Sequence, residues 1–182
     1  MDDYQQIVEF LKAIDEAIEE AVALYVIGGG SITLALDHLN RTEDIDVVGV
    51  GQNIIDLAGK QSELAKKYNV YIQKISEIGF TAPRDWRDRA KQINLGLSKL
   101  SIFCADIHDV ILGKLARMQQ KDVDDIMSLY EKNYLDIPYL LQRLNDNKKE
   151  LLNIEYRNNA KLAFEQIFNK KLIFREGQAK LT

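Results

Sequence analysis

The stretch from Tyr25 to Val50 reads YVIGGGSITLALDHLNRTEDIDVVGV. An apolar run ends in three glycines, a short helical pattern follows, and two aspartates one residue apart lead into a second apolar run. Residues two apart in a strand project from the same face, so the carboxylates of Asp44 and Asp46 point together. The stretch therefore predicts a strand, a glycine turn, a helix and a second strand that begins with an acid pair.

Composition sets broad limits on fold and function. The chain has 182 residues and 46% hydrophobic content, enough to bury the core of one domain, or of one domain with a small appendage. A net charge of -4 gives no overall attraction to nucleic acid. Residues 143–182 are locally basic, with nine Lys or Arg against five acids. The single cysteine, Cys104, excludes an internal disulfide and is expected to be a buried, inert thiol.

No targeting or membrane segment is expected. The N-terminus, MDDYQQIVEF, is acidic and lacks the basic and apolar regions of a signal peptide. No apolar run approaches the 18 residues of a membrane-spanning helix. These features predict a cytoplasmic protein without a membrane partner.

The periodicity of the first half predicts alternating helices and strands. Residues 3–21 have the three- and four-residue apolar spacing of an amphipathic helix, and residues 24–29 read as a buried strand. Residues 70–75 predict a further strand, and residues 93–97 and 100–105 predict a hairpin. The expected fold class is α+β or α/β, a mixed sheet flanked by helices.

From Asp106 onward the pattern is helical to the end, and the final FREGQAKLT is expected to be frayed. No Gly/Ser linker or repeat interrupts the chain. We therefore expect an α/β domain over residues 1–115 and a helical region over residues 116–182 that packs on it.

The glycines fit neither of two common phosphate-binding motifs. A Walker loop requires GxxxxGK[ST], and no lysine follows at that spacing. A dinucleotide-binding GxGxxG would use Gly28 and Gly30 but meets Thr33 at the third position. Two interpretations stay open: a phosphate-binding turn of another kind, or a tight strand-to-helix turn that needs positive φ.

The acid pair suggests a cation. Two ionised carboxylates side by side repel each other, and a bound cation would relieve the repulsion. Hard oxygen ligands on few protein groups suit Mg²⁺, which takes the rest of its shell from water and substrate phosphates. In the alternative interpretation Asp44 caps or turns the chain and Asp46 pairs with Arg41.

These residues carry a family resemblance. The GGS of Gly29 to Ser31 followed by DID resembles the signature of minimal nucleotidyltransferases of the polymerase-beta-like superfamily. The fuller string GGGSITLALDHLNRTEDIDVV is similar to that of the AbiEii-like nucleotidyltransferases of bacterial toxin-antitoxin systems. CADIHDVILGKLARMQQKDVDDI resembles their downstream block, in which a helical lysine precedes K-D-x-x-D. Together the two blocks cover roughly residues 22–130.

The resemblance implies a role for each matching residue. The triphosphate would be held by the glycine turn and the helix N-terminus, at Gly29, Gly30 and Ser31. Mg²⁺ would bind the catalytic carboxylates Asp44 and Asp46, and the catalytic Lys114 would contact the phosphates. Supporting roles fall to Asp122 or Asp125, which would orient Lys114 or hold the helical half in place. Arg41 and Thr42 match the family's turn before the acids.

The implied activity is Mg²⁺-dependent transfer of a nucleotidyl group from an NTP to a hydroxyl of RNA, such as a tRNA end, or of a protein. In a toxin-antitoxin setting a cognate antitoxin would be a further partner. A third carboxylate, which many superfamily members carry on a later strand, has no clear counterpart, since Asn94 and Asp106 are the nearest candidates. The alternative is a catalytically silent, antitoxin-like module that binds nucleotide or partner.

Other polar residues admit two interpretations. The stretch APRDWRDRAK, residues 82–91, combines cations with Trp86 and suits RNA contact, or it tucks Trp86 under its arginines. Arg117 and Lys121 read better as a solvated helix face, whereas Lys114 could be either site or surface. His108 is expected to be structural.

Overall fold

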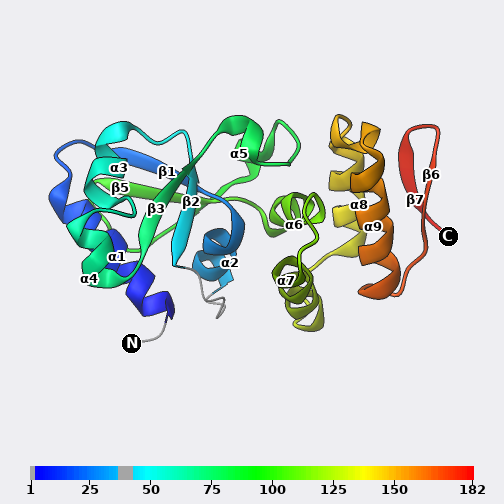
Figure 1. Cartoon of the computed structure of the whole chain (residues 1–182), viewed down its shortest axis with the longest axis horizontal. Coiled ribbons are helices and arrows are strands. Elements are labelled where there is room, and N and C mark those ends of the chain that lie inside the picture. The colour runs from blue at the N-terminus through cyan, green and yellow to red at the C-terminus, as the bar shows by residue number, and fades with distance from the viewer. Residues whose placement is uncertain (1–2, 37–42) are drawn as a thin grey trace. The chain divides into compact units, whose positions relative to one another are not determined.

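A computed structural model describes residues 3–36 and 43–182 (Figure 1). Two compact units make up the chain: the first spans residues 1–80 and 87–106, the second residues 81–86 and 107–182. The predicted fold class is confirmed, since a five-stranded mixed sheet with helices is followed by a helical C-terminal part.

The first unit contains one sheet and several helices. Its strands are β1 (Val22–Val26), β2 (Asp44–Val48), β3 (Tyr71–Ile75), β4 (Lys91–Ile93) and β5 (Leu100–Cys104). Its helices are α1 (Asp3–Ala17), α2 (Gly28–Leu36), α3 (Gln52–Ala58), α4 (Glu63–Tyr68) and the 3-10 helix η1 (Glu77–Gly79). A single helical turn, α5 (Trp86–Arg89), lies where the chain passes between the units.

The strand order is β3-β2-β1-β5-β4 (Figure 1). β1 lies at the centre, antiparallel to β2 and parallel to β5. β2 and β3 run parallel, which requires the helical crossover through α3 and α4 between them. β4 and β5 pair antiparallel, as the predicted hairpin requires, but β4 covers Lys91–Ile93 where the sequence predicts a strand over residues 93–97.

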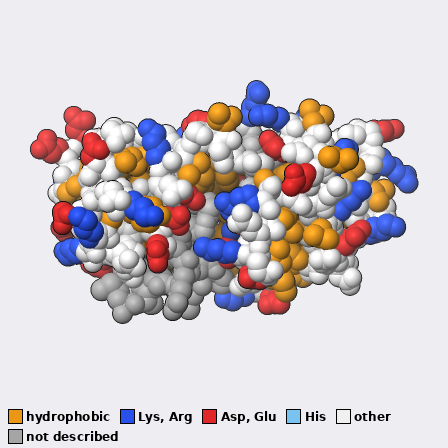
Figure 2. Space-filling view, in the orientation of Figure 1, with side chains coloured by type: hydrophobic (Ala, Val, Ile, Leu, Met, Phe, Trp, Pro, Cys, Tyr) orange, Lys and Arg blue, Asp and Glu red, His pale blue; other side chains and the backbone are white. Residues whose placement is uncertain are grey.

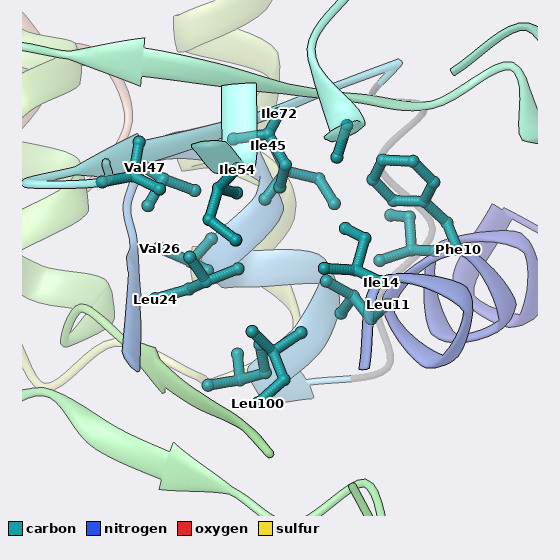
Figure 3. Packing of buried hydrophobic residues seen from close by; sticks show 14 of the residues in the cluster. Phe10, Leu11, Ile14, Leu24, Val26, Ile45, Val47, Ile54, Ile72 and Leu100 are labelled. Atoms are coloured by element: carbon teal, nitrogen blue, oxygen red, sulfur yellow. The ribbon is translucent and has the colours of Figure 1, made fainter. Parts of the chain in front are cut away.

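The hydrophobic core covers one face of this sheet. Phe10, Leu11 and Ile14 of α1 are fully buried and point toward the strands in Figure 3. Ile45 and Val47 meet them from β2, as the alternation of this strand predicts. Full burial of each such side chain stabilises the fold by about 1.5–3 kcal/mol. The other face carries Asp44, Asp46, Tyr25 and Phe103, and we call it the acid face.

A buried carboxylate ties the end of α1 to the start of β5. Asp15 accepts hydrogen bonds from the backbone N–H groups of Ser98 (3.0 Å), Lys99 (2.7 Å) and Leu100 (2.7 Å), and from the Ser98 hydroxyl (3.0 Å). The hydrogen bond from the Ser98 N–H makes the largest contribution to the pKa of Asp15 and lowers it. Burial alone would raise this pKa, but the hydrogen bonds together lower it from 3.8 to about 2. The ionised form is therefore part of the fold.

The second unit contains helices and one hairpin. Its helices are α6 (Ile107–Leu115), α7 (Gln120–Glu131), α8 (Ile137–Asp146), the 3-10 helix η2 (Glu150–Leu152) and α9 (Ile154–Gln166). Two side chains of α9 satisfy carbonyl groups in the last turn of α6: the Tyr156 hydroxyl donates to Leu112 O (3.4 Å) and Asn159 Nδ2 to Leu115 O (2.9 Å). α9 therefore completes the end of α6.

A buried arginine joins three segments of the second unit. Arg143 of α8 is 1% exposed at its side chain and donates to both carboxylate oxygens of Asp109, at 2.8 and 2.9 Å. Asp85 (3.2 Å) and Asp146 (3.1 Å) complete its ion pairs. Burial by itself would lower the pKa of Arg143, but the hydrogen bonds and charge of Asp109, with Asp85, raise it above its ordinary value.

The expected frayed C-terminus is wrong. Residues 172–181 form an antiparallel hairpin of β6 (Leu172–Arg175) and β7 (Gln178–Leu181). Glu176 and Gly177 form its two-residue turn with φ of 52° and 74°, the backbone of a type I′ turn, which suits the strand twist. The side chain of Asn145 exchanges two hydrogen bonds with the backbone of Ala179 and holds β7 to α8.

Among the residues described, no helix is both long enough and apolar enough to cross a membrane.

Replacing Asp15 with Asn is expected to lower the urea midpoint of unfolding at pH 7, because the amide presents a donor to N–H groups that need an acceptor. The folded pKa lies below the unfolded one, so the stability that Asp15 contributes is present above about pH 4 and lost as the pH falls toward 2. The difference in urea midpoint between wild type and Asp15→Asn should therefore be smaller at pH 3 than at pH 7. Glu16→Gln, at an exposed neighbouring position, serves as control; an equal loss in both variants would contradict the assignment.

Candidate functional site

The turn between β1 and α2 brings a glycine against an acid of β2. Gly28 has a φ of +62°, a conformation that L side chains rarely adopt. A Cβ atom at this position would lie 3.0 Å from Asp46 Oδ2. The backbone also connects them, since the Ile27 N–H donates to Asp46 O at 2.9 Å. Position 28 therefore requires glycine for two reasons: its backbone conformation and its close contact with the Asp46 carboxylate.

Gly29 and Gly30 form the first turn of α2. A Cβ at Gly30 would approach Val26 Cγ1 to 3.3 Å and Ile45 Cγ2 to 3.5 Å, so glycine lets the helix lie close to β1 and β2. The first N–H groups of an α-helix have no acceptor within the helix and favour anions. The structure thus places a helix N-terminus beside Asp46.

Ser31 supports this turn from within the core. Its side chain is fully buried, and its hydroxyl donates to Ala105 O at 2.8 Å, which links α2 to the end of β5. Its backbone N–H donates to Ile27 O at 3.4 Å. The role of Ser31 in holding a triphosphate stays a prediction, and its hydroxyl is engaged in the fold.

Asp44 and Asp46 lie on the same face of β2, and both are partly exposed. Within the described ranges, no group of three or more His, Cys, Asp or Glu side chains is arranged to hold a metal ion. The protein donors are thus two hard carboxylates beside a glycine turn that leaves room next to Asp46 Oδ2. This donor set fits Mg²⁺, which keeps waters and takes phosphate oxygens as its remaining ligands.

On β1 and β5 the acid face carries the aromatic residues Tyr25 and Phe103 and no third acid. Tyr25 of β1 pairs with Val48, two residues along from Asp46, and with Phe103 of β5. Asn94 and Asp106 are the nearest candidates in the sequence for the third carboxylate. Asn94 lies after β4, and its side chain accepts a hydrogen bond from the Gly96 N–H at 3.0 Å. Asp106 directly precedes α6. The central strands of the sheet therefore carry two acids on this face, not three.

Lys114 lies in a buried ion network of the second unit. Its Nζ is 2.5 Å from Asp125 Oδ2 and 3.4 Å from Asp122 Oδ1, and all three side chains are at most 8% exposed. Arg117 adds an ion pair of 2.9 Å to Asp122, whose other oxygen accepts from the Gln119 N–H and caps α7. The structure thus brings the predicted lysine and both predicted aspartates together and joins α6 to α7.

The remaining sequence predictions have varied outcomes. Arg41 and Thr42 lie outside the described residues. Trp86 is 4% exposed, so it is tucked into the fold and offers no stacking surface. His108 accepts a hydrogen bond from the Asp136 N–H at 3.0 Å, the structural role expected of it. Burial raises the pKa of the Cys104 thiol to about 12, which makes it inert as predicted.

Sequence reasoning missed the ion pair of Arg143 with Asp109. The two residues are 34 positions apart and on different helices, so no local pattern connects them. A cation in the apolar helix IPYLLQRLND was the available signal, because a buried arginine requires acidic partners.

Acidic and basic side chains are intermixed on the face shown in Figure 2, in keeping with the modest net charge of -4. No curated protein and no solved structure matches the chain significantly. A family model described as "Nucleotidyltransferase of unknown function (DUF6036)" matches residues 3–172.

Lys114→Met is expected to lower the free energy of unfolding by about 3–5 kcal/mol, because it leaves the buried carboxylate of Asp125 without its cation and removes one of the two cations paired with Asp122. Chemical denaturation measures the loss. Lys121→Met, at an exposed position of α7, should leave the free energy of unfolding within about 0.5 kcal/mol of wild type. Additional Asp122→Asn and Asp125→Asn substitutions should recover part of the loss; equal stability of Lys114→Met and wild type would refute the network's structural role.

Proposed function

Because the chain belongs to the DUF6036 family of nucleotidyltransferases of unknown function, we propose that it transfers a nucleotidyl group from an Mg²⁺-bound NTP to a hydroxyl of an acceptor. The observation that carries this proposal is the contact between the glycine turn and the acid pair. A Cβ at Gly28 would lie 3.0 Å from Asp46 Oδ2, so a phosphate at the helix N-terminus is close to a carboxylate that can hold its metal.

Each group at the site has a physical task. The N–H groups at the start of α2 bind phosphate oxygens, and the close approach of Gly30 to Val26 fixes the helix relative to β1. Asp44 and Asp46 hold the cation, which supplies charge neutralisation and alignment of the phosphates for in-line transfer. Ser31 keeps the turn in place through Ala105. A phosphate contact is the role that the sequence resemblance suggests for Lys114, whose side chain pairs with Asp122 and Asp125 in the second unit.

The acceptor and the biological setting form the finer part of the proposal. The glycine turn, the acid pair and the helical K-D-x-x-D block resemble those of the AbiEii-like toxins, which supports a toxin-antitoxin role with RNA, such as a tRNA end, or protein as acceptor. A cognate antitoxin is the partner that such a role implies. The locally basic residues 143–182 favour RNA over protein.

A silent nucleotide-binding module is the second candidate, favoured by one specific observation. Neither β1 nor β5 carries a carboxylate on the acid face, where Tyr25 and Phe103 lie, so these strands supply no general base beside the acid pair. A site without that base still binds Mg²⁺-NTP. Binding and transfer therefore separate the two functions.

Calorimetric titration of ATP, GTP, CTP and UTP, each with and without Mg²⁺, tests the site. The wild type is expected to bind at least one nucleotide in a metal-dependent manner. Asp44→Asn/Asp46→Asn should weaken this binding by 100-fold or more, since both metal ligands lose their charge. Asp56→Asn, an exposed acid on α3, should bind as the wild type does.

Incubation with the bound nucleotide, α-labelled, and separate RNA and protein acceptors then distinguishes enzyme from module. Label on either acceptor identifies its class, whereas tight binding without transfer selects the silent module. Failure of the wild type to bind any of the four nucleotides would overturn the proposal.

Gly28→Ala tests the glycine turn against a matched control. Gly28 and Gly96 have φ of +62° and +69°, so alanine at either position costs about 1–2 kcal/mol of stability. Only at Gly28 does the new methyl group meet a carboxylate, since a Cβ at Gly96 has no atom within 4 Å. Gly28→Ala is therefore expected to weaken Mg²⁺-NTP binding at least tenfold and Gly96→Ala to leave it unchanged. Equal affinities of the two variants would contradict the contact's role.

A further inference from the structure

An aromatic stack crosses the two central strands on the acid face. The rings of Tyr25 in β1 and Phe103 in β5 lie 5.1 Å apart at an interplanar angle of 16°. The Arg87 guanidinium lies 5.0 Å from the centroid of the Tyr25 ring, and Glu77 pairs with it. Arg87 also passes close to Gly49, where a Cβ would come within 3.0 Å of Nη2. Two rings and one planar cation are thus held together by three separate segments of the first unit.

The stack lies on the same face of the sheet as the acid pair. Tyr25 is the register partner of Val48, which shares its face with Asp46 two residues away, and Phe103 is one strand further. With strands about 4.8 Å apart and a rise of about 3.3 Å per residue, the stack is roughly 8 to 12 Å from Asp46. This is the length scale of a single nucleotide, so phosphates at the acid pair leave the base near the rings.

Accessibility and charge favour a planar ligand. Tyr25 and Phe103 are half-buried, and exposed Ala23 and Gln92 flank them on the acid face. A cross-strand aromatic pair stabilises a sheet by itself. The guanidinium beside the Tyr25 ring adds a cation to the π system, and base recognition uses both. The buried Trp86 offers no such surface.

We propose that Tyr25, Phe103 and Arg87 form a stacking surface for the base of the bound NTP. This inference rests on the proposed function, since the acid pair must hold the phosphates for the base to reach the rings. Every base can stack on an aromatic ring. The surface therefore increases the affinity for NTP more than it selects among the four nucleotides.

Phe103→Leu removes the π face and keeps an apolar side chain. It is expected to raise the Kd of Mg²⁺-NTP about tenfold, the usual scale of one lost base stack, and to leave the Kd of Mg²⁺-tripolyphosphate unchanged, because that ligand has no base. The matched control is Tyr68→Leu on α4, whose ring contacts Phe10 edge-on and Lys67 at 4.8 Å and thus has the same kind of neighbours. The control should leave both constants unchanged.

Arg87→Lys provides a second variant if Phe103→Leu does not fold. Its side chain is 37% exposed, so the change keeps the charge without opening the core. Loss of the planar group should weaken NTP binding about threefold and spare tripolyphosphate. A variant that affects both ligands equally, or neither, overturns the stacking surface while the proposed function stands.

Two further outcomes separate the alternatives. If the wild type binds neither NTP nor tripolyphosphate with Mg²⁺, the proposed function fails and the stacking surface with it. Titration of a single-stranded RNA oligonucleotide without NTP tests whether the rings stack on a base of RNA instead of the base of the NTP. If Phe103→Leu weakens RNA binding and leaves NTP binding unchanged, the assignment to the NTP is overturned.

Discussion

The antiparallel pairing of β1 with β2 is the constraint on which the candidate site depends. It sets Gly28, at the end of one strand, against Asp46, near the start of the other, and the Ile27 N–H to Asp46 O bond keeps them together. A shift of one residue in this register would turn Asp44 and Asp46 into the core and bring Ile45 out. The same pairing therefore fixes the fold and puts the helix N-terminus beside the acid pair.

Alternation along β2 then divides the first unit into two environments. Ile45 and Val47 pack with α1 and so cannot change without cost, whereas Asp44 and Asp46 are partly exposed on the other face. Because the apolar positions fix the register, they also fix where the two carboxylates lie on β2. Preorganisation of the candidate metal ligands is thus a by-product of core packing.

Local patterns predicted the local structure. The glycine turn, the acid pair on one face, the buried thiol of Cys104 and the mixed α/β class follow from period and composition over short windows. Short sequence windows did not predict the contacts between distant segments. Arg143 with Asp109, and Tyr25 with Phe103, depend on which helices and strands are neighbours, and periodicity does not specify this. The hairpin turn at Glu176 and Gly177 has a local signal, but helical sequence precedes it and predicts a frayed end there.

In the helical unit, five charged residues are buried and paired with one another: Asp109, Lys114, Asp122, Asp125 and Arg143. Helices of 9 to 13 residues have little stability of their own, so contacts such as Lys114 with Asp125 decide how α6 and α7 meet. Burying these charges costs solvation, and removing one partner costs more than the pair contributes. Loss of activity on substituting Lys114 would therefore report on the fold as well as on phosphate contact. The glycine turn after β1 and the partly exposed acid pair of β2 give the cleaner test of function, since substitutions there change the candidate ligand-binding groups without unpairing a buried charge.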